Sequence, residues 1–543
     1  MSGKRLSIYL FVTLTASLLV AILVKDSYLW MDEVLSYLLL TDPSLAHANR
    51  ALVSGMDANP PLFVNVYWLL AHGISADAYF LKGISVGLFA LTLAWFYRYI
   101  SDGQLVSRLS RRFVAVNFVL VLVALSLTYL HYTLSTQLRT YSLYLLISWG
   151  YVVVLHQLIH EPHRRRRLLA LAAVGTLFLF SHNVALFYIA GSGVFFGLLW
   201  LFTSDRRYVG VLAVHAGLAL IWLLAWYPSF AVQALAGKPH SWIPLPTFLT
   251  TFETIGDLLP TLSSRLEKRY PALLLLRVSG VAALLLAVLV SRGRQWGWSV
   301  RRDRAFSLYL LSGFLAGFTL LLGLVISLTY TSVFLSRYFW PSSLLLIYQL
   351  LYAGWWLRDQ AVARRSAWAG VVVQPLAGVF HRLKQQPVLS GLMLALFVGA
   401  IATFMVQQSR KIPLFNGEIR QDIALLPVNR PVVFESAYYF LPIWFHQPKR
   451  PVHYFFDWQA VMHPRNDLAS TTDYKILEGV AQHYQPTGLT TLSAFKARQQ
   501  GPFYVVDESS RYLIEKFVAG GQVRIRRVIP SHVPGHRILE CSF

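Results

Sequence analysis

Two adjacent carboxylates, Asp32 and Glu33, are the first residues along the chain that could do chemistry. They lie in Tyr28-Leu-Trp-Met-Asp-Glu-Val34, flanked by aromatic and apolar residues. A carboxylate in such surroundings can accept a proton from a hydroxyl nucleophile. The alternative is a solvated pair at a membrane surface, and the dipeptide alone does not exclude it.

Three basic residues lie where a membrane protein normally carries few. Arg139 and Arg337 lie at the outer ends of apolar stretches, and Lys82 lies four or five residues into another. Ionisable groups at membrane depth are costly and are usually paired or functional. Guanidinium groups bind phosphate oxygens through two parallel hydrogen bonds, so a phosphate near the outer leaflet would account for them. The alternative for each arginine is that its side chain extends to the lipid headgroups.

Several other polar residues are weaker candidates. His131 and His182 lie at the outer ends of apolar stretches, where a histidine can act as a base or a donor but is more often structural. Asp57 lies shortly before Asn59-Pro-Pro-Leu62. A proline at the first position of a helix fixes the direction in which the chain enters that helix. Alternative bases, should the carboxylate pair not serve, are Asp57, His131 and Glu253.

The elements that must position these residues are membrane spans. The chain has 543 residues, of which 56% are hydrophobic and 13% charged, and its mean hydropathy is +0.51. This composition excludes an ordinary soluble globular protein. Stretches of roughly 18 or more apolar residues are long enough to cross a bilayer as helices. They predict about 11 spans: 6–24, 78–99, 113–130, 141–159, 168–181, 184–203, 208–227, 271–291, 305–328, 337–356 and 387–406.

The net charge of +23 does not indicate a nucleic-acid partner, because the positions of the basic residues fit a role in orienting the chain in the membrane. Arginine clusters fall in every second loop, as in 164–167, which predicts that these loops and the N-terminus are cytoplasmic. An odd number of spans then places the C-terminus outside, in the periplasm or exterior of a bacterial inner or plasma membrane. Cys541 is the only cysteine, so an intramolecular disulfide or a cysteine-based metal site is excluded.

Two predicted external loops and the tail are candidates for shaping a site. Loop 25–77 contains short apolar segments at 34–40 and 61–71 that are typical of helices lying in the interface. Loop 228–270 carries many charged residues, among them Lys268. We therefore divide the chain into a transmembrane module, 1–408, and an external domain, 409–543. In the tail, strand patterns at 430–436, 451–457 and 502–507 alternate with helix patterns at 437–447 and 511–519, which predicts a small α/β domain.

The order of these motifs resembles the GT-C superfamily of membrane glycosyltransferases, specifically protein O-mannosyltransferases and lipid A aminoarabinose transferases. The resemblance covers about residues 1–355 and rests on five short motifs. They are Trp30-Met-Asp-Glu33, Asn59-Pro-Pro-Leu62, Gln137-Leu-Arg-Thr-Tyr-Ser142, Ser181-His182 and Ser336-Arg-Tyr338. Gln137 and Asn59 depart from the residues that many relatives carry there, which leaves the donor sugar and acceptor undefined.

The resemblance implies a polyprenyl- or dolichyl-phosphate sugar donor and a catalytic carboxylate in the first external loop. Asp32 or Glu33 would then deprotonate an acceptor hydroxyl, and direct displacement would invert the anomeric centre. Donor phosphate-binding candidates are Lys82, Arg139, Lys268 and Arg337, and further pocket candidates are Asp57, His131, Tyr141, His182, Glu253 and Tyr338.

The expected partners are the lipid-linked donor, a glycan, lipid or protein acceptor and membrane lipids, without nucleic acid. The sequence requires no cofactor and no metal, although a divalent cation could share the role of the arginines. A transporter or lipid flippase remains the alternative, because it would also combine many spans with intramembrane charges. It would favour a pseudo-repeat with broken helices in matching positions, which the sequence does not show.

Overall fold

The computed structural model describes residues 28–102, 129–236, 242–260, 267, 269–296, 303–363, 403, 417–499 and 501–543. The chain packs into two compact units, each assembled from separate parts of the sequence. The first unit comprises Met1–Lys25, Lys82–Trp222 and Leu245–Ser409. The second comprises Asp26–Leu81, Leu223–Pro244 and Arg410–Phe543, so it joins the first predicted external loop to the C-terminal tail.

The first unit is a helical bundle. Within the described residues, six helical segments are long and apolar enough to cross a membrane: Ala78–Ile100, Tyr141–His160, Ala185–Thr203, Arg206–Ala225, Pro271–Arg294 and Arg304–Thr329. They correspond to α5 (Ala78–Ile100), α8 (Tyr141–His160), α10 (Ala185–Thr203), η2 (Arg206–Tyr208) with α11 (Val209–Ala225), α15 (Pro271–Trp296) and α16 (Arg304–Thr329). These helices agree with predicted spans and identify an integral membrane protein.

The predicted count of 11 spans is not confirmed. The predicted spans 6–24 and 387–406 and most of 113–130 lie outside the described residues, apart from an isolated position. Two other predicted spans are helices that fall short of the length or hydropathy of the six, namely α9 (Arg165–Leu179) and α17 (Pro341–Ala363). The shorter helices of this unit are α7 (Tyr129–Thr136) and α13 (Phe248–Leu258).

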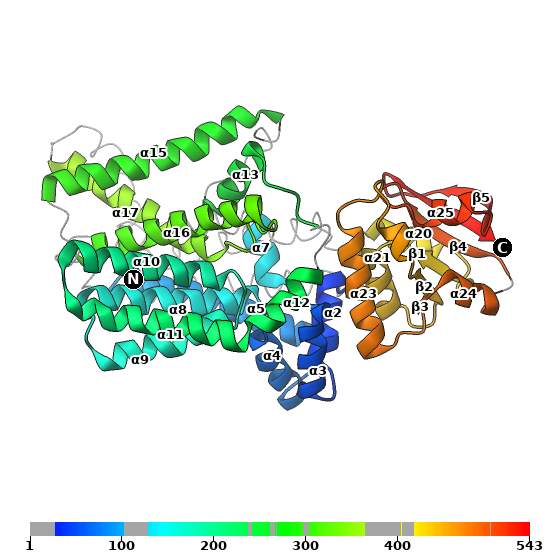
Figure 1. Cartoon of the computed structure of the whole chain (residues 1–543). Helices are drawn as coiled ribbons and strands as arrows, with labels where there is room; N and C mark the ends of the chain where they lie inside the picture. The colour runs from blue at the N-terminus through cyan, green and yellow to red at the C-terminus, as the bar shows by residue number, and fades with distance from the viewer. Residues whose placement is uncertain are drawn as a thin grey trace, which may run out of the picture. The chain divides into compact units, whose positions relative to one another are not determined.

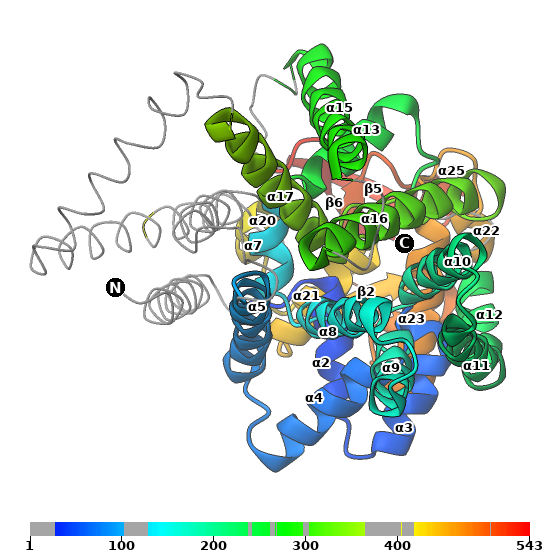
Figure 2. The same cartoon turned by 90° about the vertical axis from the view of Figure 1, so that its left-hand side faces the viewer.

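The bundle is built around α8. Helices α8, α9, α10 and α16 lie side by side, and α17 packs against both α8 and α16 (Figures 1 and 2). Large aromatic side chains fill this centre, and Tyr144, Trp149 and Tyr188 are almost wholly inaccessible. At the start of α16, Asp303 accepts hydrogen bonds from backbone N–H groups of the first turn of the helix. It also forms an ion pair with Arg292 at 3.1 Å. Such an N-cap satisfies donors that a helix cannot satisfy itself.

The part of the second unit formed by the first predicted external loop is also helical. It contains α2 (Met31–Leu40), α3 (Leu45–Ala51), the π-helical turn η1 (Leu52–Met56) and α4 (Leu62–Gly73), and α12 (Tyr227–Ala236) packs on η1. The predicted short helices at 34–40 and 61–71 are thus present as α2 and α4. Gly55 has a φ of 100°, a left-handed conformation that glycine adopts without a Cβ clash, and it ends the helical run before Asp57.

The tail is the predicted small α/β domain. Its six strands are ordered β3-β2-β1-β4-β6-β5, with β1 to β4 parallel and β6 antiparallel to both β4 and β5. The strands are β1 (Val432–Phe434), β2 (Val452–Phe455), β3 (Leu489–Thr490), β4 (Phe503–Glu508), β5 (Arg524–Pro530) and β6 (His536–Ser542). The helices are α20 (Gly417–Ala424), α21 (Ala437–His446), α22 (Trp458–Val461), α23 (Ser470–Tyr484), α24 (Leu492–Arg498) and α25 (Leu513–Ala519).

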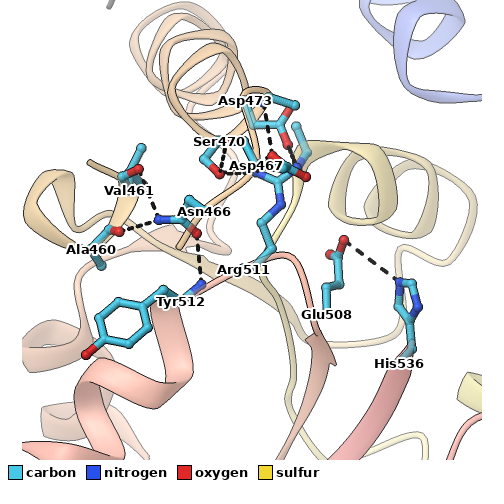
Figure 3. Close-up of polar contacts among 12 residues, drawn as sticks. Ala460, Val461, Asn466, Asp467, Ser470, Asp473, Glu508, Arg511, Tyr512 and His536 are labelled. Atoms are coloured by element: carbon cyan, nitrogen blue, oxygen red, sulfur yellow. Dashed lines mark hydrogen bonds and ion pairs between the residues drawn. The ribbon is translucent and has the colours of Figure 1, made fainter. Parts of the chain in front are cut away.

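A buried charged network joins the tail's helices to its sheet. Arg511 forms an ion pair with Asp473 at 2.9 Å and donates to Ser470 Oγ at 2.8 Å, while Glu508 faces His536 (Figure 3). Glu435, directly after β1, accepts hydrogen bonds from the backbone N–H groups of Glu508 and Ile514. Burial, opposed by Arg511, raises the pKa of Glu508 to about 7. Burying charge is costly unless it is paired, so this network depends on its mutual contacts.

Candidate functional site

Three of the motifs quoted from the sequence meet at His182 in the first unit. His182 lies between α9 and α10, and its ring stacks on Tyr144 at a centroid distance of 4.7 Å. The rings of Tyr338 and Tyr141 lie 5.3 Å and 6.2 Å from it. Beside this cluster, Thr140 Oγ1 donates to the carbonyl of Ser181 at 2.7 Å. The segments 137–142, 181–182 and 336–338 are therefore neighbours in space.

The charges at this cluster suit an anion. Burial and then the positive charges of Arg139 and Arg337 lower the pKa of His182 to about 3, so both arginines lie within electrostatic reach of one imidazole. The ring is consequently neutral, and its Nδ1 accepts the backbone N–H of Val184 at 3.2 Å. Two cationic side chains next to a neutral imidazole favour a negatively charged group at this place.

The three predicted phosphate-binding residues that the structure describes are all partly or wholly buried. Arg139 and Lys82 are each 8% exposed, and Lys82 lies in the second turn of α5. Arg337 is half-buried, and its guanidinium carbon lies 5.4 Å from the ring centroid of Tyr338. The fourth candidate, Lys268, lies outside the described residues.

His131 has a structural contact that the sequence did not reveal. Its Nδ1 accepts the indole N–H of Trp340 at 2.6 Å, and both side chains are buried. An acceptor at Nδ1 places the proton of the neutral ring on Nε2. This contact joins α7 to the segment before α17, and it favours the structural interpretation of His131 over a role as base.

In the second unit, the adjacent carboxylates have different surroundings. Both lie in the first turn of α2, where the partial positive charge of a helix N-terminus stabilises anions. Glu33 is fully buried, and its Oε2 accepts the backbone N–H of Trp30 at 3.4 Å, so it closes the first turn. Asp32 is half-buried. The accessible carboxylate is therefore Asp32, which makes it the better candidate for a base.

The remaining candidate acids are placed differently. Asp57 is 6% exposed, and it accepts from Asn59 through Oδ1 at 2.8 Å and from Gln233 through its carbonyl at 2.9 Å. Glu253 is exposed on α13. On the same helix, Asp257 accepts a hydrogen bond from Ser336 Oγ at 3.2 Å, next to Arg337. Sequence reasoning did not single out Asp257, because it is one of many charges in a long loop.

The described residues contain no group of three or more histidine, cysteine or acidic side chains that could hold a metal ion.

Comparisons with known proteins identify the fold. No protein-family model matches the sequence, and no characterised protein sequence matches it. Among solved structures, the chain is similar to ArnT from Cupriavidus metallidurans in the apo state. The TM-score is 0.51 and the identity 14%, over 98% of this chain and 97% of that chain. It is also similar to the same protein bound to undecaprenyl phosphate, with a TM-score of 0.50 and 14% identity over 100% of this chain and 98% of that chain.

The likeness to ArnT covers the transmembrane unit and the tail together. At 14% identity it shows the fold alone. The shared fold agrees with the resemblance that the short sequence motifs predict.

Proposed function

We propose that this integral membrane protein is a glycosyltransferase of the GT-C type that takes its sugar from a polyprenyl-phosphate donor. The observation that carries the proposal is that the segments of Arg139 and Arg337 meet at His182: Thr140 Oγ1 donates to the Ser181 carbonyl at 2.7 Å, and the Tyr338 ring lies 5.3 Å from the His182 ring. Two arginines on segments that meet at one place suit a phosphate better than they suit separate contacts with lipid headgroups. The fold of ArnT, solved with undecaprenyl phosphate bound, supports the same class of ligand.

The proposed reaction is a single displacement at the anomeric carbon. The acceptor hydroxyl loses its proton to Asp32 as its oxygen forms a bond to the anomeric carbon. The bond from that carbon to the phosphate oxygen breaks, and polyprenyl phosphate leaves with the electron pair. Attack from the face opposite the leaving group inverts the configuration. A phosphate leaves without being protonated, so the reaction needs a base but no separate acid.

In this proposal, the residues of the first unit bind and neutralise the phosphate. Arg139 and Arg337, with Lys82, would hold its oxygens and stabilise the negative charge that grows as the glycosidic bond breaks. Lys268 keeps its predicted supporting role. The sugar, the lipid length and the acceptor class are left open. The outward orientation of the tail remains a prediction from the charge pattern of the loops.

The proposal is tested by following a labelled sugar. Purified protein is incubated with undecaprenyl-phosphate-linked radiolabelled sugars and with glycolipid, glycan and protein fractions of a bacterial envelope. We expect label to appear in one fraction with release of an equal amount of undecaprenyl phosphate. In proteoliposomes, label that stays on its lipid but changes leaflet would instead support a flippase. The proposal would be contradicted if the protein neither transferred the sugar from any lipid-phosphate donor nor bound such a donor.

A further inference from the structure

The second unit joins the candidate catalytic helix to the tail. Helix α2 packs against α21, and η1 packs against α23, so the first external loop and the C-terminal domain share one body. The tail is thus more than an appended domain in this chain. Its contacts with α2 lie at both ends of that helix.

The contact at the start of α2 centres on His446, the last residue of α21. Its Nε2 accepts the backbone N–H of Leu29 at 2.8 Å, three residues before Asp32. The same imidazole packs against the ring of Tyr28 in a tilted arrangement, with a centroid distance of 3.9 Å. The guanidinium of Arg420, from α20, lies 3.8 Å from the centroid of the Tyr28 ring. Because Leu29 is buried and precedes the N-cap residue Trp30, this contact fixes the chain as it enters α2.

The contact at the end of α2 centres on Tyr484, the last residue of α23. Its hydroxyl donates to Asp42 Oδ2 at 2.8 Å, directly after the C-cap residue Thr41. Asp42 is 3% exposed. Burial would raise the pKa of Asp42, but hydrogen bonds from Ser44, His47 and Tyr484 outweigh it and lower the pKa. Asp42 is therefore a carboxylate at neutral pH, and it accepts the tail's hydroxyl as a charge-assisted hydrogen bond.

A third contact lies between the two ends. The ring of Tyr37, on the middle of α2, meets the ring of Phe445 edge to face at a centroid distance of 5.4 Å. The tail therefore contacts α2 before its first turn, along its length and after its last turn. Three contacts spaced along a ten-residue helix constrain its axial position and its rotation, which together determine where Asp32 points.

We infer that the C-terminal domain positions the candidate base, with His446 as the principal positioning residue and Tyr484 as the second. His446 acts through the backbone of Leu29 and not on substrate. The kinetic part of this inference rests on the proposed function, whereas its structural part concerns only α2 and the tail. Loss of the His446 contact should disturb turnover more than donor binding, because the proposed phosphate-binding residues belong to the other unit.

The test compares His446→Ala, His446→Gln and the control His463→Ala in the full-length protein. His463 is a matched control because its ring also packs against a tyrosine ring, that of Tyr512 at a centroid distance of 3.6 Å, but within the tail itself. Hydrogen exchange of the amides of residues 28–35 is the first measurement. We expect it to rise about tenfold in His446→Ala, the effect of losing a hydrogen bond of ordinary strength. It should recover at least in part in His446→Gln, whose amide oxygen can accept from Leu29, and stay unchanged in His463→Ala.

Steady-state kinetics with a lipid-phosphate sugar donor is the second measurement. In His446→Ala we expect kcat to fall by about tenfold or more, with less than about a twofold change in the donor KM. Tyr484→Phe, which loses only the hydroxyl, should increase exchange at residues 37–42 and gives an independent test should His446→Ala not fold.

The outcomes separate this inference from the proposed function. Unchanged exchange at 28–35 in His446→Ala, or an equal rise in His463→Ala, would overturn the positioning role. If His446→Ala does not fold and only Tyr484→Phe can be measured, unchanged exchange at residues 37–42 in Tyr484→Phe would overturn the positioning role. Altered exchange as expected, in a protein whose native form transfers no sugar, would leave the structural part intact and refute the proposed function.

Discussion

The side chain of Glu33 folds back to the backbone N–H of Trp30, with 3.4 Å between Oε2 and the nitrogen. This contact distinguishes two neighbouring carboxylates that the sequence alone does not distinguish. Glu33 is buried and closes the first turn of α2, whereas Asp32 is half-buried.

The first prediction follows from that division. Asp32→Asn should reduce kcat for sugar transfer by about 10²–10⁴ because it removes the base while keeping the shape. Glu33→Gln retains an oxygen that can accept from Trp30, so it should reduce kcat by less than about tenfold. Transfer assays on both variants, with donor binding measured in parallel, check this. Full activity in Asp32→Asn would mean that the base is another residue, with Asp57 or Glu253 the next to test.

The second prediction concerns the phosphate. Arg139→Ala and Arg337→Ala should each weaken binding of polyprenyl phosphate by about tenfold to a hundredfold, the loss of one charged hydrogen-bonding group. Lysine at either position should recover only part of the affinity, because a point charge cannot reproduce the planar fork. The matched control is Arg292→Lys, since Arg292 is also buried but pairs with Asp303. Equal weakening in the control would show that the losses are general.

The third prediction separates structure from catalysis at His131. His131→Leu leaves the buried indole N–H of Trp340 without its acceptor, so the protein should lose about 1–3 kcal/mol of stability. Thermal unfolding in detergent measures this loss. Because His131 is assigned no chemical role, the donor Kd and the kcat of the folded fraction should stay within about twofold. A stable variant without turnover would restore His131 as a candidate base.

The fourth prediction is a pH dependence of the tail. The pKa of Glu508 is raised in the folded protein to about 7, so folding takes up a proton between the ordinary pKa of a glutamate and that value. The associated stability is fully present below the unfolded pKa and is lost as the pH rises through 7. Hydrogen exchange of β4, corrected for the chemical exchange rate, should show a less stable tail at pH 8 than at pH 5. Glu508→Gln should reduce this difference without abolishing it, because burial also raises the pKa values of the neighbouring Glu435 and Asp473. A tail that is more stable at pH 8 would contradict the assignment.

The fifth prediction is the orientation of the chain. In a Cys541→Ser background, a cysteine replacing the exposed Lys496 of the tail should react with a membrane-impermeant reagent in intact cells. A cysteine replacing Arg166 should react only after the membrane is opened. The reverse pattern would place Asp32 on the cytoplasmic side and would overturn the orientation inferred from the arginine clusters.

The sequence predicts the individual elements well where one local signal dominates. Apolar length predicts α8 and α16 closely, and the strand pattern before Glu435 predicts β1. It does not predict α3 or η1, because Leu45–Met56 mixes alanine, histidine and glycine without an apolar period. Nor does it predict β5, because its three arginines break up the apolar pattern of a strand. In the structure β5 is an exposed edge strand paired with β6.

Contacts between distant parts of the chain limit what the sequence can predict about the site. Arg139 and Arg337 are conspicuous because arginine is unexpected at the outer end of a span, and that signal makes both candidates. The bond from Leu29 to His446 has no such signal, because it joins a backbone amide to an ordinary histidine more than 400 positions later. The difference between Asp32 and Glu33 likewise depends on which side chain turns inward.

The measurement that tests the central claim most directly is an experimental structure of the protein with undecaprenyl phosphate bound. We predict phosphate density in contact with the guanidinium groups of both Arg139 and Arg337, at hydrogen-bond distances of about 2.7–2.9 Å. Density for the phosphate elsewhere, with both arginines directed to lipid headgroups, would contradict the account.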